Sequence, residues 1–345
     1  MLGIDQRVLK AAWTIFLFAL AVVLLYVIRG ALVTFTLALF LALLLSPVVT
    51  FVDHFTSIRV PRTVALAVVY VALIAVFAAA LIAIGSGIAD DARSLAGKLP
   101  AAVQGDPLSR MPLPGWLEPV RERIGGWLHD RMDDFGQNAL ALAGRAVQEL
   151  ATGLGAVVSA VLVPILAFFF IMDGRDLRDR IISSFPNHRQ VLVHELLQDL
   201  HRLLSQYLRA LVILSIVTFV CYSGFLTITG SHYAVLLGGI AALLEFIPAV
   251  GPFAAMVTIL LVSVFSGYTQ SILLVTFFAV YRVVLDYVLQ PMLLSAGMRI
   301  HPLLIIFGVL AGGEIGGILG IFFSIPLIAA LRLVLLRLWK HPVTK

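Results

Sequence analysis

Residues 245–252 read EFIPAVGP and interrupt a long apolar stretch, Tyr233 to Ser266, in which Glu245 is the only charged residue. A second apolar stretch, Pro302 to Leu331, is interrupted in the same way by GGEIGG at 312–317. Backbone groups freed by Pro or Gly cannot hydrogen-bond to lipid, so such interruptions persist only where protein or a water-filled cavity satisfies them. A pair of interrupted apolar segments in corresponding positions therefore predicts the binding site of a transporter.

The composition of the chain predicts an integral membrane protein. Of its 345 residues, 61% are hydrophobic and only 12% are charged, whereas a soluble domain carries roughly 25% charged residues. The net charge of +5 is explained by the Lys and Arg that flank membrane segments on the cytoplasmic side, so no nucleic-acid partner is expected. Cys221 is the only cysteine and lies in an apolar run, which excludes a disulfide framework and a cysteine metal site.

We expect an all-α polytopic membrane protein of eight apolar segments. Crossing about 30 Å of hydrocarbon takes roughly 20 residues of helix. Six runs meet this length with almost no charged residue: Ala11–Ile28, Ala31–Val52, Thr63–Ala89, Ala151–Met172, Ala210–Ser231 and Ser271–Gln290. The two interrupted stretches complete the set.

Basic residues predict the orientation. With the N-terminus inside, most Lys and Arg fall in the cytoplasm, including Arg59, Arg62 and the Arg residues of 173–209. The segment 90–149, which is more acidic than basic, then becomes an extracytoplasmic insert. A lid, an oligomer contact and a passive spacer all remain open as its role.

The interrupted stretches can be full spans or re-entrant hairpins, and both alternatives return the C-terminus to the cytoplasm. Each arm around 248–252 holds roughly 14 residues, or about 21 Å of helix, which enters the membrane without crossing it. Arg299 in the loop between the stretches also favours hairpins. Two units, each a span followed by a hairpin, then form an inverted repeat that supports alternating access.

The chain resembles the autoinducer-2 exporter family (AI-2E, PerM-type permeases) over nearly its whole length. The blocks that carry the resemblance are Asp199–Arg202, Tyr207–Arg209, Glu245–Pro252, Gln290-Pro291, His301–Leu303, Ala311–Gly313, Gly316–Gly320 and Pro326-Leu327. The chain departs from the pattern at Ala210 and Leu211, where a glycine commonly follows. The resemblance implies a bacterial inner-membrane transporter and a homo-oligomer, with a pentamer as one form it suggests.

Glu245 and Glu314 are the first candidates for binding substrate or ion, because an ionisable group inside a membrane is costly and often marks a transport path. Burial favours the protonated carboxyl, which makes proton coupling a natural hypothesis. The alternative is a structural carboxylate that caps free backbone amides. Pro248, Gly251 and Pro252 are expected to form a turn at membrane depth. Gly312 and Gly313 combine the second interruption with a small-residue spacing that lets helices pack closely. Backbone contact with substrate is a second possible role for both sets.

Arg282 and Asp286 are four residues apart on one predicted helix face, where they can form an ion pair. Gln290 lies one turn further. The pair is either purely structural or part of a site that attracts a polar or anionic solute.

Other function classes find little support. The chain has no nucleophile elbow, no Walker A sequence and no HExxH, since Gln198 stands where a zinc ligand would be needed. An enzyme, a metal site and a cofactor are therefore not expected. A passive channel and a sodium/proton antiporter remain alternatives to a secondary transporter that exports a small polar solute such as autoinducer-2.

The expected regions are 1–89 with three spans, the 90–149 insert, a fourth span at 150–172, an interfacial helical segment at 173–208, a transport region at 209–338 and a cytoplasmic tail at 339–345.

Overall fold

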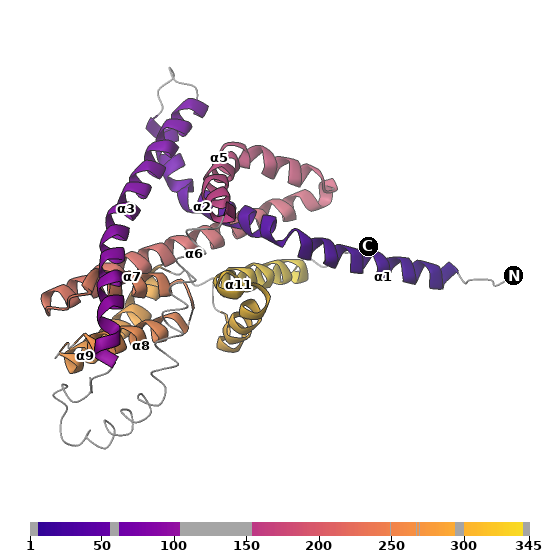
Figure 1. Ribbon diagram of the computed structural model, residues 1–345. Coiled ribbons are helices and arrows are strands. Elements are labelled where there is room, and N and C mark those ends of the chain that lie inside the picture. The colour runs from indigo at the N-terminus through magenta and orange to yellow at the C-terminus, as the bar shows by residue number, and fades with distance from the viewer. Residues whose placement is uncertain are drawn as a thin grey trace.

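The computed structural model describes residues 6–55, 62–103, 154–248, 250–266, 268, 270–293 and 300–340. Within these ranges the chain is helical and contains no strand, as the sequence predicts (Figure 1). The helices are α1 (Gln6–Val27), α2 (Arg29–Phe55), α3 (Arg62–Val103), α5 (Leu154–Ser183), α6 (Asn187–Ile228), α7 (Ala234–Leu244), α8 (Val250–Phe265), α9 (Ser271–Val284), α10 (Gln290–Leu293) and α11 (Pro302–Lys340), with a π-helical turn at Leu285–Leu289 between α9 and α10.

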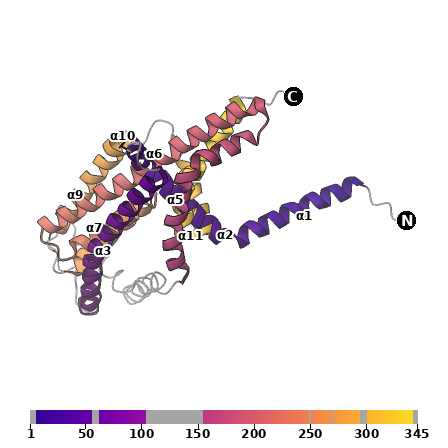
Figure 2. The ribbon, with the colours of Figure 1, turned by 90° about the horizontal axis from the view of Figure 1, so that it is seen from above.

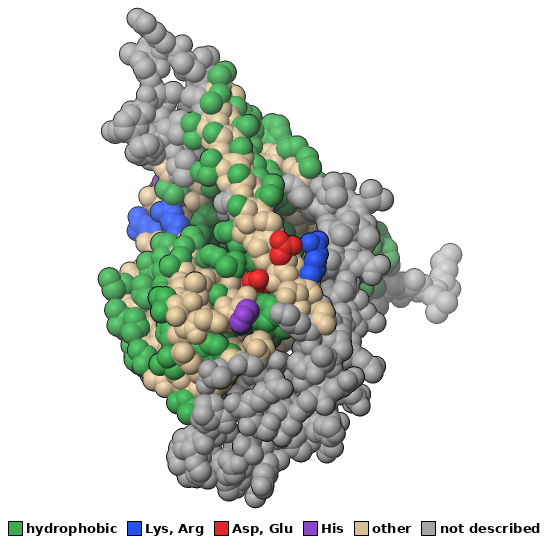
Figure 3. Space-filling view, turned by 60° about the vertical axis from the view of Figure 1, so that its left-hand side comes forward, with side chains coloured by type: hydrophobic (Ala, Val, Ile, Leu, Met, Phe, Trp, Pro, Cys, Tyr) green, Lys and Arg blue, Asp and Glu red, His purple; other side chains and the backbone are tan. Residues whose placement is uncertain are grey.

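Among the described residues, four helical segments are long and apolar enough, by length and composition alone, to cross a membrane: Arg29–Pro47, Asn187–Ile228, Ser271–Leu293 and Pro302–Arg337. Shorter apolar helices lie at Ala12–Val27, Leu66–Val76, Ala234–Leu244 and Val250–Ser263. Large hydrophobic side chains are exposed along most of these helices. On the face shown in Figure 3, hydrophobic side chains predominate over charged ones among the described residues. Because soluble monomers rarely expose apolar surface on this scale, this surface fits a protein embedded in lipid.

Several described helices, α3, α5 and α6 among them, continue beyond the predicted spans. The predicted boundary between the segments 173–208 and 209–338 falls inside α6, a single helix of 42 residues. Such a helix is about 63 Å long, roughly twice the thickness of the hydrocarbon layer, so its polar half must extend outside the membrane. Likewise α3 runs past Ala89 to Val103, the beginning of the predicted insert. The remainder of that insert lies outside the described residues.

The main hydrophobic core lies between α6, α7, α8 and α9. Its most buried members are Leu226, Leu237, Ile259, Leu274 and Leu285. Tyr222, Phe277 and Tyr281 pack against one another inside it. A second contact joins α2 to α5 through small residues, because Ala38 and Ala167 are completely buried and let the helices approach closely. By contrast, α1 projects away from the other helices in Figures 1 and 2 and contacts chiefly α2.

The stretch 233–266 forms a helical hairpin, which we call the first hairpin. Its arms are α7 and α8, and they pack together on either side of the turn that begins at Glu245. Gly251 is required at this turn, because a Cβ on it would lie 1.8 Å from the carbonyl oxygen of Leu244. The interruption of the sequence therefore coincides with a reversal of chain direction.

The stretch 302–331 also reverses direction, within α11, and we call α11 the second hairpin. The reversal occurs at Gly317, whose φ of +58° lies in the region that favours glycine. The arms then run side by side, since a Cβ on Gly320 would lie 1.9 Å from the carbonyl oxygen of Gly312. Further along, a Cβ on Gly308 would lie 2.3 Å from the Ile328 side chain. Both interrupted stretches thus have hairpin geometry.

Candidate functional site

Glu245 lies at the point where α7 ends. Its backbone N–H still donates to Ala241, but Pro248 three residues later has no N–H and cannot continue the helix. The carboxylate points into the protein, and only 7% of its side chain is exposed. A charge buried to this degree needs a partner.

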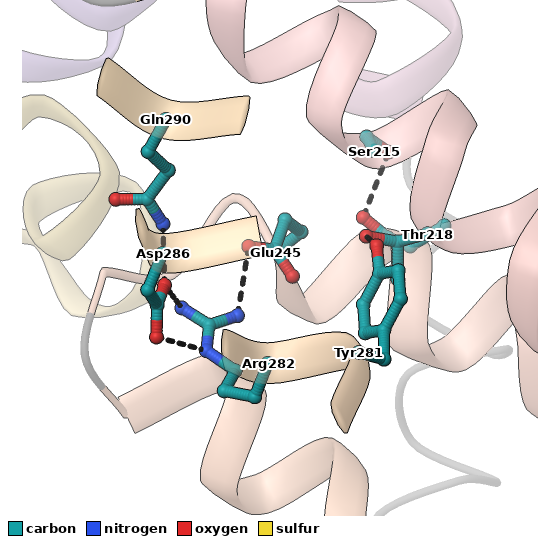
Figure 4. A network of polar contacts seen from close by, with 8 residues as sticks. Ser215, Thr218, Glu245, Tyr281, Arg282, Asp286 and Gln290 are labelled. Atoms are coloured by element: carbon teal, nitrogen blue, oxygen red, sulfur yellow. Dashed lines mark hydrogen bonds and ion pairs between the residues drawn. The ribbon is translucent and has the colours of Figure 1, made fainter. Parts of the chain in front are cut away.

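That partner is Arg282 of α9, which connects two carboxylates (Figure 4). Its Nη1 donates to Oε1 of Glu245 at 3.2 Å. Its Nε and Nη2 donate to Asp286 at 2.8 and 2.6 Å, a bidentate pair. Gln290 donates to the same Asp286 oxygen that Nη2 contacts, at 2.9 Å. We call Glu245, Arg282, Asp286 and Gln290 the carboxylate network.

The network becomes more accessible away from Glu245. The exposed fraction of the side chain is 24% for Arg282 and 36% for Asp286. Asp286 also lies in the π-helical turn Leu285–Leu289. Single π turns within α-helices occur frequently at functional sites. A buried carboxylate and an accessible one therefore share a single guanidinium.

Hydroxyl groups surround the buried side of the network. Ser215 donates to the carbonyl oxygen of Ala242 at 2.8 Å. This carbonyl is near the end of α7, where carbonyls lack helical partners. Thr218 and Tyr281 share a hydrogen bond of 2.7 Å, and Figure 4 shows them on the side of Glu245 away from Asp286. These contacts tie the end of the first hairpin to α6 and α9.

The structure brings four of the ten predicted site residues into the network: Glu245, Arg282, Asp286 and Gln290. Three others, Pro248, Gly251 and Pro252, form the adjacent turn and the start of α8. The sequence had indicated the pair of Arg282 with Asp286, and the structure confirms it. It had not indicated that Glu245 pairs with Arg282, or that Ser215 and Thr218 lie beside it. The sequence feature that could have indicated them is the spacing of Ser215 and Thr218, two hydroxyl residues three positions apart in an apolar run.

The remaining candidates lie on the second hairpin and do not join this network. Gly312 is in backbone contact with Gly320, and Gly313 lies near Ile321, which are packing roles. Glu314 is exposed, and it makes no hydrogen bond or ion pair with any described residue. The two candidate glutamates, Glu245 and Glu314, are therefore not brought together in this structure. The hairpins instead meet through Phe246 and Phe322, whose ring centroids are 5.9 Å apart.

Polar contacts also hold the two hairpins at positions away from this network. On the first hairpin, the backbone N–H of Leu236 in α7 donates to Asp91 of α3 at 3.3 Å. On the second, Arg337 pairs with Asp199 and with Glu195 of α6, the latter at 2.8 Å. Each hairpin is thus joined to a neighbouring helix by a carboxylate contact.

The carboxylate network can hold one additional positive charge. Two carboxylates and one guanidinium leave a single net negative charge when all three groups are ionised. In a membrane setting such a charge is costly, so a proton or a metal cation that neutralises it is favoured. Since both acids bind the same guanidinium, neutralising one lets Arg282 pair more fully with the other.

Comparison with known proteins agrees with this architecture. The family model described as "AI-2E family transporter" matches residues 15–339. The AI-2 transport protein TqsA of Escherichia coli is 23% identical over 88% of this chain and 85% of its own length. YrrI of Bacillus subtilis is 22% identical over 90% of this chain and 87% of its own. PerM of E. coli is 28% identical over 52% of this chain and 51% of its own length. The predicted family is confirmed: the chain belongs to the AI-2E transporter family.

Proposed function

We propose that this chain is a secondary transporter that exports a small polar solute, such as autoinducer-2, in exchange for protons or sodium. The carboxylate network carries this proposal. It places a net negative, partly accessible group at the turn of a broken helical element, which is where coupling ions bind in transporters with this construction. The relative TqsA is named for transport of AI-2, and this supports the solute class.

Coupling follows from competition for Arg282. With no cation bound, Arg282 is shared between Glu245 and Asp286. A proton or sodium ion on Asp286, the more accessible acid, frees the guanidinium to pair with Glu245 alone. Since Glu245 belongs to the first hairpin and Asp286 to the π-helical turn that follows α9, this exchange alters the attachment of the hairpin to its neighbour.

The membrane arrangement that fits this mechanism has six spans and two re-entrant hairpins. The helix α6 followed by the first hairpin forms one unit, and α9 with α10 followed by the second hairpin forms the other. An inverted relation between these units gives alternating access. We place both termini in the cytoplasm, 90–149 outside, and the whole chain in the bacterial inner membrane as a homo-oligomer, with a pentamer as the form to test.

Glu314 retains a proposed role at the turn of the second hairpin. Its side chain is exposed, so a solute in an aqueous cavity can reach it. In this arrangement the ion binds at Asp286 and acts on Glu245 through Arg282, while Glu314 contacts the solute from the opposite hairpin. The two residues then act at different steps.

Flux in sealed proteoliposomes tests the proposal. An imposed pH or sodium gradient should drive saturable, concentrative movement of a polar solute by the wild-type protein. The sodium/proton antiporter alternative predicts exchange of the two ions with no solute present. The passive channel alternative predicts solute flux that only dissipates its own gradient, and this result would reject coupled transport.

A further inference from the structure

A pocket of about 700 Å³ lies between α2, α5 and the polar half of α6. Its walls are mostly apolar, with Leu43 of α2, Phe170 of α5 and Leu204 of α6 among them. Its volume is within the range typical of ligand pockets. None of its residues belongs to the carboxylate network, so the proposed transport mechanism does not account for it.

The pocket lies where its helices change from apolar to polar. On α5 the apolar run ends at Met172, and the lining continues from Phe170 and Ile171 to Arg175 and Arg178. On α6 the lining includes Leu204 together with the polar Gln198. A pocket that crosses this boundary is at the depth of lipid headgroups, with its apolar part facing the acyl chains.

Among the described residues, the charged and titratable side chains that line the pocket are basic. Arg175, Arg178 and His201 contribute to the lining, and no carboxylate of the described residues does. Arg178 also pairs with Asp179 at 3.2 Å, but both side chains are about half exposed or more, so this contact is weak. A second pocket of about 450 Å³ between α2 and α5 differs, because Asp173 and Asp176 line it together with Arg180.

We propose that the larger pocket binds an anionic phospholipid. The phosphate lies against Arg175 and Arg178, and an acyl chain lies along Leu43 and Phe170. Basic pockets between membrane helices on the cytoplasmic side are typical sites for such headgroups. The lipid joins α2 to α5 and α6 and so stabilises α6, the helix that contributes Ser215 and Thr218 to the site.

The test measures lipid binding to the purified full-length protein, delipidated in a neutral detergent, by native mass spectrometry and thermal stability. Phosphatidylglycerol should bind and stabilise more than phosphatidylcholine with the same acyl chains. Each arginine near an anionic headgroup contributes roughly fivefold in affinity, so Arg175→Gln with Arg178→Gln should weaken phosphatidylglycerol binding roughly 25-fold. The matched control is Arg180→Gln with Arg189→Gln, which removes the same charge from outside the pocket and should retain the wild-type preference.

A second variant tests the apolar part of the pocket independently of charge. Gly174 lines the pocket, and a Cβ on it would meet nothing within 4 Å, so Gly174→Leu adds a side chain to open space. Leucine also favours helix more than glycine does, so folding should be retained. This variant should lose phosphatidylglycerol binding, whereas Gly85→Leu, in equally open space on α3, should not.

Three results would overturn the proposal. One is equal binding of the two lipids by the wild-type protein. Another is unchanged phosphatidylglycerol binding by the Arg175, Arg178 double variant or by Gly174→Leu. The third is equal stabilisation by glycerophosphoglycerol, which has the headgroup without acyl chains. Because binding is measured without transport, failure here leaves the proposed transport function unaffected.

Discussion

Arg282 of α9 donates a hydrogen bond to Glu245 at the turn of the first hairpin, 37 positions earlier in the chain. The same guanidinium holds Asp286 one helical turn away on its own helix. Asp286 is therefore a near neighbour of Arg282 in the chain, whereas Glu245 belongs to a separate element. The ion pair of Arg282 with Glu245 connects the first hairpin to α9.

The first prediction concerns the stability of the network. Arg282→Gln leaves two carboxylates without their cation and should destabilise the protein by about 2–3 kcal/mol, somewhat less than a fully buried pair because Arg282 is 24% exposed. Adding Glu245→Gln removes the more buried unpaired charge and should restore part of the loss. Thermal unfolding of the two single variants and the double variant measures this coupling. Additive effects would show that the two residues do not interact.

The second prediction concerns the turn of the first hairpin. Gly251→Ala places a methyl group against the Leu244 carbonyl and should cost roughly 1–3 kcal/mol. Gly224→Ala in α6 is the control, because a Cβ there meets nothing within 4 Å, and it should leave stability unchanged or slightly raised. Equal melting temperatures for the two variants would argue against the close approach of α7 and α8.

The third prediction concerns the second hairpin. Gly312→Ala and Gly320→Ala should each separate the two arms of α11, since a Cβ at either position meets the backbone of the other arm. Gly316→Ala, in open space, should have little effect. Hydrogen exchange over 302–340 should increase in the first two variants only. Uniform protection in all three would indicate a straight α11, and thus a full span.

The fourth prediction concerns the contact between Arg337 and α6. Arg337→Gln removes the ion pairs with Glu195 and Asp199, so the second arm of α11 should exchange its amide hydrogens faster. Lys340→Gln, near the end of the same helix, provides a control with the same charge change. If Arg337→Gln leaves exchange in α11 unchanged, the contact does not hold the arm.

The sequence predicted the elements better than their relations. Uncharged runs and the Pro and Gly interruptions are local signals, and they correctly indicated helices that reverse at 245–252 and 312–317. The uncharged runs did not indicate where α3 and α6 end, because a change from apolar to polar residues alters the surroundings of a helix without breaking it. The i, i+4 pair of Arg282 and Asp286 was predictable for the same local reason.

The contact of Glu245 with Arg282 was not predictable, because it depends on how α7 packs against α9. The exposure of Glu314 was not predictable either. An ionisable residue in an apolar stretch usually faces the interior of a membrane protein, but the position of Glu314 beside the turn of the second hairpin leaves its side chain exposed. Its role in binding the solute stays a prediction.

Gradient-driven flux by the Glu245→Gln protein in proteoliposomes tests the central claim most directly, with Asp90→Asn, an exposed carboxylate on α3, as the control. Glu245→Gln should remain folded and lose solute movement driven by an imposed pH or sodium gradient, because Arg282 then stays with Asp286 in both states. Asp90→Asn should transport like the wild type. Undiminished gradient-driven flux in folded Glu245→Gln protein would contradict the account.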